Sequence, residues 1–151
     1  MTNRASLKDP LIGLPGYVLR RAAAAALAEL NERLAPLALR HSDAAFLILI
    51  DASPGITQSR AGRILDIQRA NMVPFLARQE RRGWVRRKKV DGRAQSLMLT
   101  PEGRSVLAKT RVIIDDYEAA LIKRVPRKLR AGVLPILLAL WNRPTREEAE
   151  P

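Results

Sequence analysis

The sequence of 151 residues has no cysteine, one histidine and few aromatic side chains. Without cysteine there are no disulfide bonds, no thiol redox sensing and no zinc–thiolate sites. The single histidine, His41, has no cysteine partner, and no glycine-rich phosphate loop precedes a predicted helix. Asp115 and Asp116 are adjacent, and neighbours on a helix point about 100° apart, so they do not share a site. We therefore predict that the protein is not an enzyme and has no cofactor or metal ion.

Long apolar runs are also missing. No stretch of 18 or more apolar residues occurs, and the first residues lack the pattern of a signal peptide. These absences predict a soluble, cytoplasmic protein. Hydrophobic residues nevertheless make up 47% of the chain, which indicates a folded protein with a real core.

Positive charge is abundant and unevenly placed. The formal net charge is +12, and residues 56–104 hold 12 cations against 4 anions. A net charge of +8 on one third of the chain is typical of a protein that binds a polyanion. The alternative is a solvated basic face without a partner.

The basic third of the chain begins with the pattern of a helix-turn-helix. Thr57 is placed to cap a short helix that ends near Leu65, and Asp66-Ile67 forms a tight turn before a second helix from Gln68. Gly62 falls where the two helices would cross, and its missing side chain lets their backbones approach. The alternative is a glycine that an ordinary helix merely tolerates.

At 100° per residue the second helix has one apolar arc, formed by Met72, Phe75, Leu76 and Gln79, which we expect to be buried. The opposite face carries Ala70, Val73, Pro74, Ala77, Arg78 and Arg81, with Asn71 on its flank. Asn or Gln pairs with adenine, Arg with guanine, and methyl groups contact thymine, so this face suits base reading in a major groove. An ordinary solvated surface is the alternative. Pro74 is expected to bend or loosen the helix.

A basic hairpin follows this helix. Gly83 can end the helix, and Asp91-Gly92 is a strong hairpin signal between two short strands. The first strand carries four consecutive cations, and Leu97 and Leu99 in the second can pack on the helices. Arg93 lies at the tip, where a guanidinium can enter a narrow minor groove. Helix, turn, helix and hairpin predict a winged helix, in a fold that is mainly α with a small β-wing.

The chain resembles the MarR family of bacterial transcriptional regulators. The most specific motif is the Asp-x-Arg of the wing, followed by Leu-Thr-x-x-Gly at residues 99–103. Further support comes from residues 54–59 and 76–78, from Glu80 with Arg82-Gly83 and Val85, and from weaker similarity over residues 14–141. The sequence departs from the usual pattern at Arg40, Asp66, Pro74 and Gln79, where the family commonly has Thr, Gly, Arg and Leu.

The resemblance implies a single MarR-like domain over residues 1–151, with a winged-helix lobe at 38–104 and dimerisation helices at 11–37 and 105–145. We expect helices from Tyr17 to about Leu34, from Ser42 or Asp43 to Ala52, and from Pro101 to about Arg124. Pro36 should break the chain after the first of these. A last, leucine-rich helix contains Pro135, which should kink it.

The leucine-rich last helix would leave an apolar patch unless a second copy covers it, so we expect a homodimer. A membrane-surface helix is the weaker alternative, because the apolar run lacks a Lys-rich polar face. A two-fold dimer would present two recognition helices to a near-palindromic operator, roughly 10 base pairs apart.

Double-stranded DNA is therefore the predicted partner, and a repressor is the predicted role. The alternative is a sequence-neutral architectural DNA-binding protein that uses the same basic wing and has no effector. The candidate DNA-contact residues are Thr57, Gln58, Ser59, Gln68, Arg69, Asn71, Val73, Pro74, Arg78, Arg86, Lys88, Lys89 and Arg93.

The family resemblance also implies an effector. Many MarR-like proteins release DNA when a small aromatic acid, a phenol or a related thioester enters the crevice between the dimerisation helices and the DNA-binding lobe. The candidate effector-binding residues are Tyr17, Arg20, Arg21, His41, Phe46 and Tyr117. For His41 the alternative is a capping or surface role. The peroxide-sensing branch of the family is excluded, because it works through cysteine.

Overall fold

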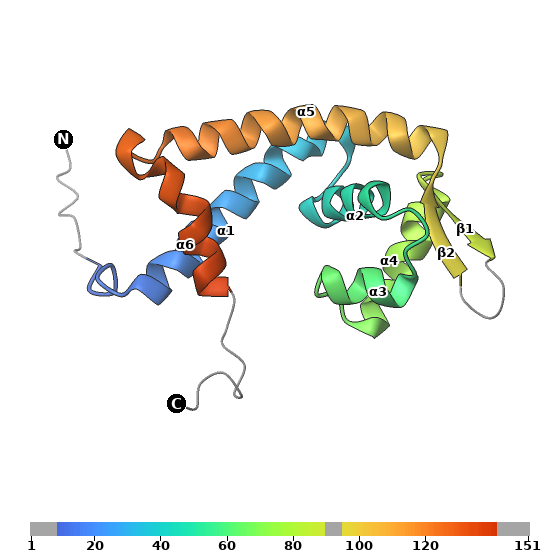
Figure 1. Ribbon diagram of the computed structural model, residues 1–151, viewed down its shortest axis with the longest axis horizontal. Coiled ribbons are helices and arrows are strands. Elements are labelled where there is room, and N and C mark those ends of the chain that lie inside the picture. Colours follow the sequence, from blue (N-terminus) through green and yellow to red (C-terminus); the bar gives the residue numbers. More distant parts are fainter. Residues whose placement is uncertain (1–8, 90–94, 142–151) are drawn as a thin grey trace, which may run out of the picture. The chain divides into compact units, whose positions relative to one another are not determined.

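The computed structural model describes residues 9–89 and 95–141 (Figure 1). In chain order its elements are α1 (Pro15–Leu34), η1 (Ala35–Leu37), α2 (His41–Ala52), α3 (Gln58–Ile64), α4 (Arg69–Arg81), β1 (Val85–Lys89), β2 (Gln95–Leu99), α5 (Pro101–Lys123), η2 (Arg127–Leu129) and α6 (Arg130–Trp141). The mainly helical fold with one small antiparallel sheet confirms the predicted class. The described helices include none with the length and apolar character needed to cross a bilayer.

The chain forms two compact units, residues 1–114 and 115–151, which divide within α5. The first unit holds α1 to β2 and the N-terminal part of α5; the second holds the rest of α5, η2 and α6. The proposed lobe at 38–104 lies wholly within the first unit. Its role as a separate DNA-binding lobe, and that of the flanking helices in dimerisation, stay predictions.

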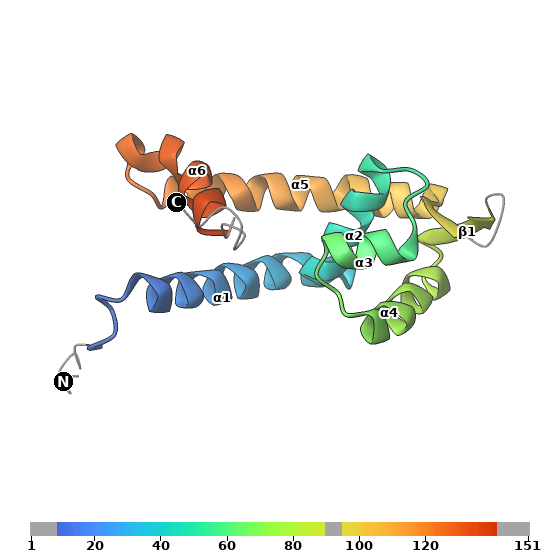
Figure 2. The same ribbon diagram turned by 60° about the horizontal axis from the view of Figure 1, so that its bottom comes forward.

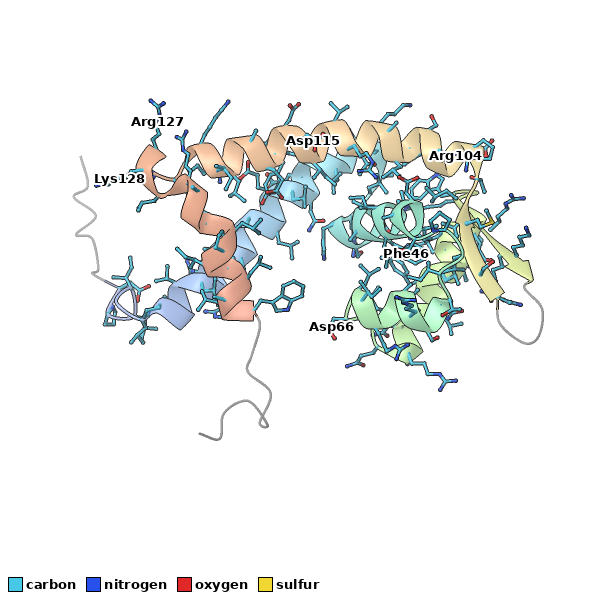
Figure 3. The ribbon with its side chains drawn as sticks, viewed as in Figure 1. Phe46, Asp66, Arg104, Asp115, Arg127 and Lys128 are labelled. Carbon is cyan, nitrogen blue, oxygen red and sulfur yellow. The ribbon has the colours of Figure 1, made fainter. Side chains whose placement is uncertain are left out.

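The core of the first unit is built around α2. Phe46 and Leu47 are fully buried and belong to one apolar cluster with Phe75 and Leu76 of α4 and Leu97 of β2. The rings of Phe46 and Phe75 meet edge to face, with centroids 5.1 Å apart. Figure 3 labels Phe46 on α2. α2 therefore holds the central position that its apolar sequence predicts.

Prolines act differently at the ends of helices and inside them. α1 begins at Pro15, two residues before the expected start, because proline fits the first turn, where its missing amide is not needed. After Leu34 the chain tightens into the 3₁₀ turn η1, which contains Pro36, so the predicted break is confirmed. α4 continues through Pro74, and α6 through Pro135, as single helices.

The wing is a two-stranded antiparallel hairpin in which Val85 pairs with Leu99 and Lys89 with Gln95. Leu97 and Leu99 are buried, as their alternation predicts. Ser96 is buried as well, because its backbone forms a β-bridge with Thr57 and its hydroxyl donates to the Lys88 carbonyl at 3.1 Å. The Asp91-Gly92 turn lies outside the described residues.

One carboxylate links α2 to α4. Asp43 is only 2% exposed. Its Oδ2 accepts the Arg40 amide at 2.9 Å, and its Oδ1 accepts Arg78 Nη2 at 2.7 Å and Gln79 Nε2 at 2.6 Å. Burial raises the pKa of Asp43, but the hydrogen bonds from the Arg40 backbone, Arg78 and Gln79 lower it more, so the pKa lies below its usual range.

The Leu-Thr-x-x-Gly motif marks a close approach between α5 and the turn before β1. The Thr100 hydroxyl oxygen accepts the Gly103 amide at 2.9 Å, and Trp84 O accepts the Thr100 amide at 3.0 Å. A Cβ on Gly103 would collide with the carbonyl group of Trp84, which is backbone and cannot swing aside. The motif therefore needs glycine for space.

Replacing Gly103 with alanine is expected to destabilise the first unit by about 3 kcal/mol, because an extra methyl in a packed site forces the backbone to shift. Urea denaturation followed by circular dichroism measures this change. Gly16→Ala is the matched control, because a Cβ there meets nothing within 4 Å. Equal stability of the two variants would contradict the steric explanation.

Acid should weaken the α2–α4 link. Because folding depresses the pKa of Asp43, its contribution to stability is present above the unfolded pKa of about 3.9 and is lost as pH falls through the folded value. Asp43→Asn should lower the free energy of unfolding by about 2–4 kcal/mol at neutral pH, and by progressively less below about pH 4.

Urea denaturation at a series of pH values tests this dependence. Asp51→Asn is the control, because Asp51 forms an ion pair with Arg111 in which both side chains are more than 40% exposed. Such an exposed pair contributes about 1 kcal/mol or less. A constant difference between wild type and Asp43→Asn at all pH values would refute the assignment.

Candidate nucleic-acid interface

The first helix of the helix-turn-helix is capped as predicted. The Thr57 hydroxyl oxygen accepts the Arg60 amide at 3.4 Å at the start of α3. Ser59 lies close by, its hydroxyl 3.3 Å from that of Thr57. These two hydroxyls and the side chain of Gln58 therefore gather at one helix end.

The turn between α3 and α4 closes without glycine. Asp66 has φ of +52°, in the left-handed region, and its amide donates to Arg63 O at 3.3 Å. The next amide, of Ile67, donates to Gly62 O at 2.8 Å. This pair of bonds is a Schellman motif, in which a short polar residue such as Asp is tolerated. Figure 3 shows Asp66 at this turn.

Gly62 lies at the predicted close approach. It is buried, and a Cβ there would stand 3.3 Å from Ile67 O and 3.6 Å from Met72 Cγ of α4. The glycine therefore brings α3 against the start of α4, and the prediction is confirmed.

Helix α4 has the two faces that its sequence predicts. Met72, Phe75, Leu76 and Gln79 are all buried. On the other side, the first two turns of α4 and its N-cap are open to solvent, including the candidates Gln68, Arg69, Asn71, Val73 and Pro74. The half of α4 that carries these candidates is thus available to a partner.

A hollow of about 840 Å³ lies between α3, α4 and β2. It is lined by Thr57, Gln58, Ser59, Gly62, Arg63, Ile67, Arg69, Met72, Val73 and Gln95. Five of the candidate DNA contacts are in this set, so the structure brings them together, whereas Gln68, Asn71 and Pro74 are exposed outside it. Figure 2 shows α3, α4 and the wing grouped at one end of the first unit.

Sequence reasoning missed two polar residues of this hollow. Arg63 is four residues after Ser59, and this i, i+4 spacing places them on the same face of α3, which is a signal that could have found it. Gln95 is the first residue of β2, and its place beside α3 follows from the bridge between Thr57 and Ser96. That long-range pairing leaves no local signal in the sequence.

The wing presents its cations unequally. Arg86 and Lys88 are exposed on β1. Arg87 instead bonds both oxygens of Glu80 on α4, at 2.9 and 3.0 Å, and also Gln95 Oε1 at 3.1 Å. The side chain of Arg87 therefore links β1 to α4. Arg93 and the side chain of Lys89 lie outside the described residues.

The expected orientation of Arg78 is corrected by the structure. Rather than facing away from the core, its guanidinium bonds the buried Asp43 of α2 and lies over the Phe75 ring, with Cζ 5.1 Å from the ring centroid. The side chain is 40% exposed. The helical wheel puts Arg78 on the outward face of α4, but the hydrogen bond to Asp43, 35 residues earlier in the sequence, turns its guanidinium towards α2.

The candidate effector residues of the first unit do not line one crevice. Tyr17 donates its hydroxyl to Asp9 Oδ2 at 3.0 Å and stacks with Arg20 and Arg21 near the start of α1. His41 lies at the start of α2, where its amide donates to Asn31 Oδ1 at 2.8 Å near the other end of α1. About 21 Å of helix separates positions 17 and 31.

Phe46 is fully buried in the core of the first unit. Tyr117 belongs to the second unit and is buried. His41 lines a separate hollow of about 460 Å³, together with Asn31, Ala35, Ala38, Leu39 and Arg40.

The described residues contain no cluster of three or more potential metal ligands.

The known proteins that resemble this chain are found among the solved structures. A scan with protein-family models and a search of curated proteins found no match. Among solved structures, the transcriptional repressor CouR bound to a 23-mer DNA duplex is similar, with 32% identity, a TM-score of 0.82, and coverage of 87% of this chain and 95% of that one. CouR bound to p-coumaroyl-CoA matches at 30% identity and a TM-score of 0.82, over 91% of this chain and 99% of that one.

A more distant structure shares the fold. The MarR family protein Rv2887 of Mycobacterium tuberculosis, in complex with salicylic acid, has 24% identity and a TM-score of 0.68, over 83% of this chain and 95% of that one. These proteins are regulators and not enzymes. The first unit contains a winged helix, and the repressor CouR is more than 30% identical to this chain over nearly its whole length. This chain therefore belongs to the MarR family of winged-helix transcriptional regulators.

Proposed function

We propose that this protein is a dimeric repressor that binds a specific, near-palindromic DNA sequence. The observation that carries the proposal is the grouping of the exposed start of α4, the polar hollow beside it and the basic strand β1 in one unit. The similarity to CouR, which was solved on a DNA duplex, supports the same partner.

The side chains divide into two kinds of contact. Gln68, Asn71 and Val73 offer an amide donor–acceptor pair or an apolar group, which suits base edges. Arg86 and Lys88 on the wing offer charge, which suits phosphates and carries no sequence information. Because both kinds lie on one unit, base reading and backbone attraction can act on the same stretch of duplex.

A second copy of the chain is the proposed partner in the dimer. In the second unit, α6 exposes Leu134, Ile136, Leu137, Leu140 and Trp141, with exposed fractions from 45% to 77%. Contiguous apolar surface of this kind on a small protein marks an interaction site. Two-fold pairing would give two recognition helices, one for each half of a palindromic operator.

An effector of the small aromatic acid, phenolic or acyl-thioester class is the third part of the proposal. CouR binds p-coumaroyl-CoA and Rv2887 binds salicylic acid. These compounds fall in the ligand classes that the family resemblance implies. The two named compounds are the first probes.

DNA selection from a random pool, followed by titration, tests the DNA-binding proposal. The selected site should bind at least about 10³-fold more tightly than random duplex, with two chains per site. Asn71→Ala should change which bases are preferred. Arg86→Ala and Lys88→Ala should each reduce the log–log salt slope by about 0.9 per bound lobe while leaving the preference intact.

Lys109→Ala is the matched control for charge, because Lys109 is an exposed cation on α5 outside the proposed interface. It should leave both the salt slope and the site preference unchanged. A protein that binds all duplexes equally would be an architectural DNA-binding protein, and the repressor proposal would then be wrong.

Effector release is a separate expectation. An active compound should raise the dissociation constant for the selected operator by about 5- to 150-fold, and operator should weaken the binding of that compound by the same factor, because the coupling is reciprocal. Fluorescence anisotropy with labelled operator and calorimetry with p-coumaroyl-CoA and salicylic acid measure the two factors. If neither these nor related aromatic acids and thioesters change operator affinity, the effector proposal fails.

A further inference from the structure

Arg78 is a surface cation whose charge is already matched. It lies on α4 seven residues after Asn71, about two helical turns, and so on the same side of the recognition helix. Its Nη2 bonds Asp43 Oδ1 at 2.7 Å while 40% of the side chain remains exposed. The guanidinium thus reaches the surface but is held by a carboxylate from α2.

Arg82 is held at the same carboxylate from one turn further along the chain. Its Nη1 is 3.9 Å from Asp43 Oδ2 and donates to the carbonyl of Ala38 at 3.0 Å. Its guanidinium also stacks on Trp84, with Cζ 4.7 Å from the ring centroid. Two of the cations at the C-terminal end of the recognition helix therefore turn towards one acid.

Asp43 is itself fixed in place. It is buried, it accepts the amide of Arg40, and Gln79, which is 0% exposed, donates to it at 2.6 Å. A carboxylate offers guanidinium the same two-oxygen edge that a phosphate offers. Where Arg78 meets Asp43, the protein thus supplies internally the kind of anion that a DNA backbone would supply.

We propose that Asp43 is an internal competitor of DNA phosphate, which withholds Arg78 from the duplex and so lowers sequence-independent affinity. This inference rests on the proposed DNA-binding function. The affinity for non-specific DNA increases with the number of phosphates that the protein neutralises. Each arginine that is kept from the duplex lowers this number by one. Contacts to bases are untouched, and the preference for the specific site over random duplex increases. Asp43 acts here as a positioning residue, because it does not itself contact DNA.

The test is the salt dependence of binding to a random-sequence duplex by the full-length protein. Asp43→Asn should release Arg78 and steepen the log–log slope by about 0.9 per bound lobe. The double variant Asp43→Asn with Arg78→Gln should return to the wild-type slope. A merely structural role for Asp43 would weaken binding at all salt concentrations and would not steepen the slope.

Asp51→Asn provides the matched control. It removes the same unit of negative charge from the same helix but releases Arg111 of α5 instead of Arg78. Its slope should equal that of the wild type. If Asp51→Asn and Asp43→Asn steepen the slope equally, the effect is one of net charge, and the proposal is wrong.

Arg78→Gln in the otherwise unchanged protein keeps the proposal testable if Asp43→Asn does not fold, as circular dichroism will show. The amide still offers Asp43 a donor, and the slope should stay at the wild-type value. A slope reduced by about 0.9 would mean that Arg78 already contacts phosphate, which overturns the proposal. A folded Asp43→Asn with an unchanged slope also overturns it. A wild-type protein that binds no duplex at all would overturn the DNA-binding function first.

Discussion

The first unit depends on a buried charge that cannot be left unpaired. Asp43 is almost completely shielded from water, and an ionised carboxylate in that position is tolerated only when it is hydrogen-bonded and paired. Its partners come from the backbone of its own helix start and from α4. The start of α2 and the C-terminal half of α4 are therefore held together by a contact that apolar packing alone would not direct. Apolar contacts such as Phe46 against Phe75 then fill the space between them.

The sequence predicts the local architecture well, because local structure follows from periodicity and turn chemistry. The buried arc of α4, the cap at Thr57 and the tight approach at Gly62 all follow from rules that act over a few residues. The sequence also predicts the turn at Asp66, although the usual glycine is missing there. Aspartate tolerates the left-handed conformation that this turn requires. Helix ends shift by a residue or two, as at Pro15.

Features that depend on distant partners are harder to predict. A helical wheel places Arg78 on an outward face, because the wheel contains only the residues of its own helix. The acid that turns it inward is 35 positions earlier in the chain. The burial of Ser96 depends in the same way on a bridge to Thr57. Which of the residues assigned to an effector crevice lie together also depends on contacts between distant segments, so that assignment stays a prediction.

The bridge between Thr57 and Ser96 has a consequence for how this regulator can diverge. Ile56 O accepts the Leu97 amide at 2.9 Å, and Leu97 O accepts the Gly55 amide at 3.2 Å. The segment that leads into α3 is therefore hydrogen-bonded to β2 of the wing. The wing and α3 are therefore held to each other by the same backbone hydrogen bonds. Exchange of exposed side chains can therefore change the chemistry of this surface, whereas the spacing between β2 and the start of α3 is fixed by the backbone.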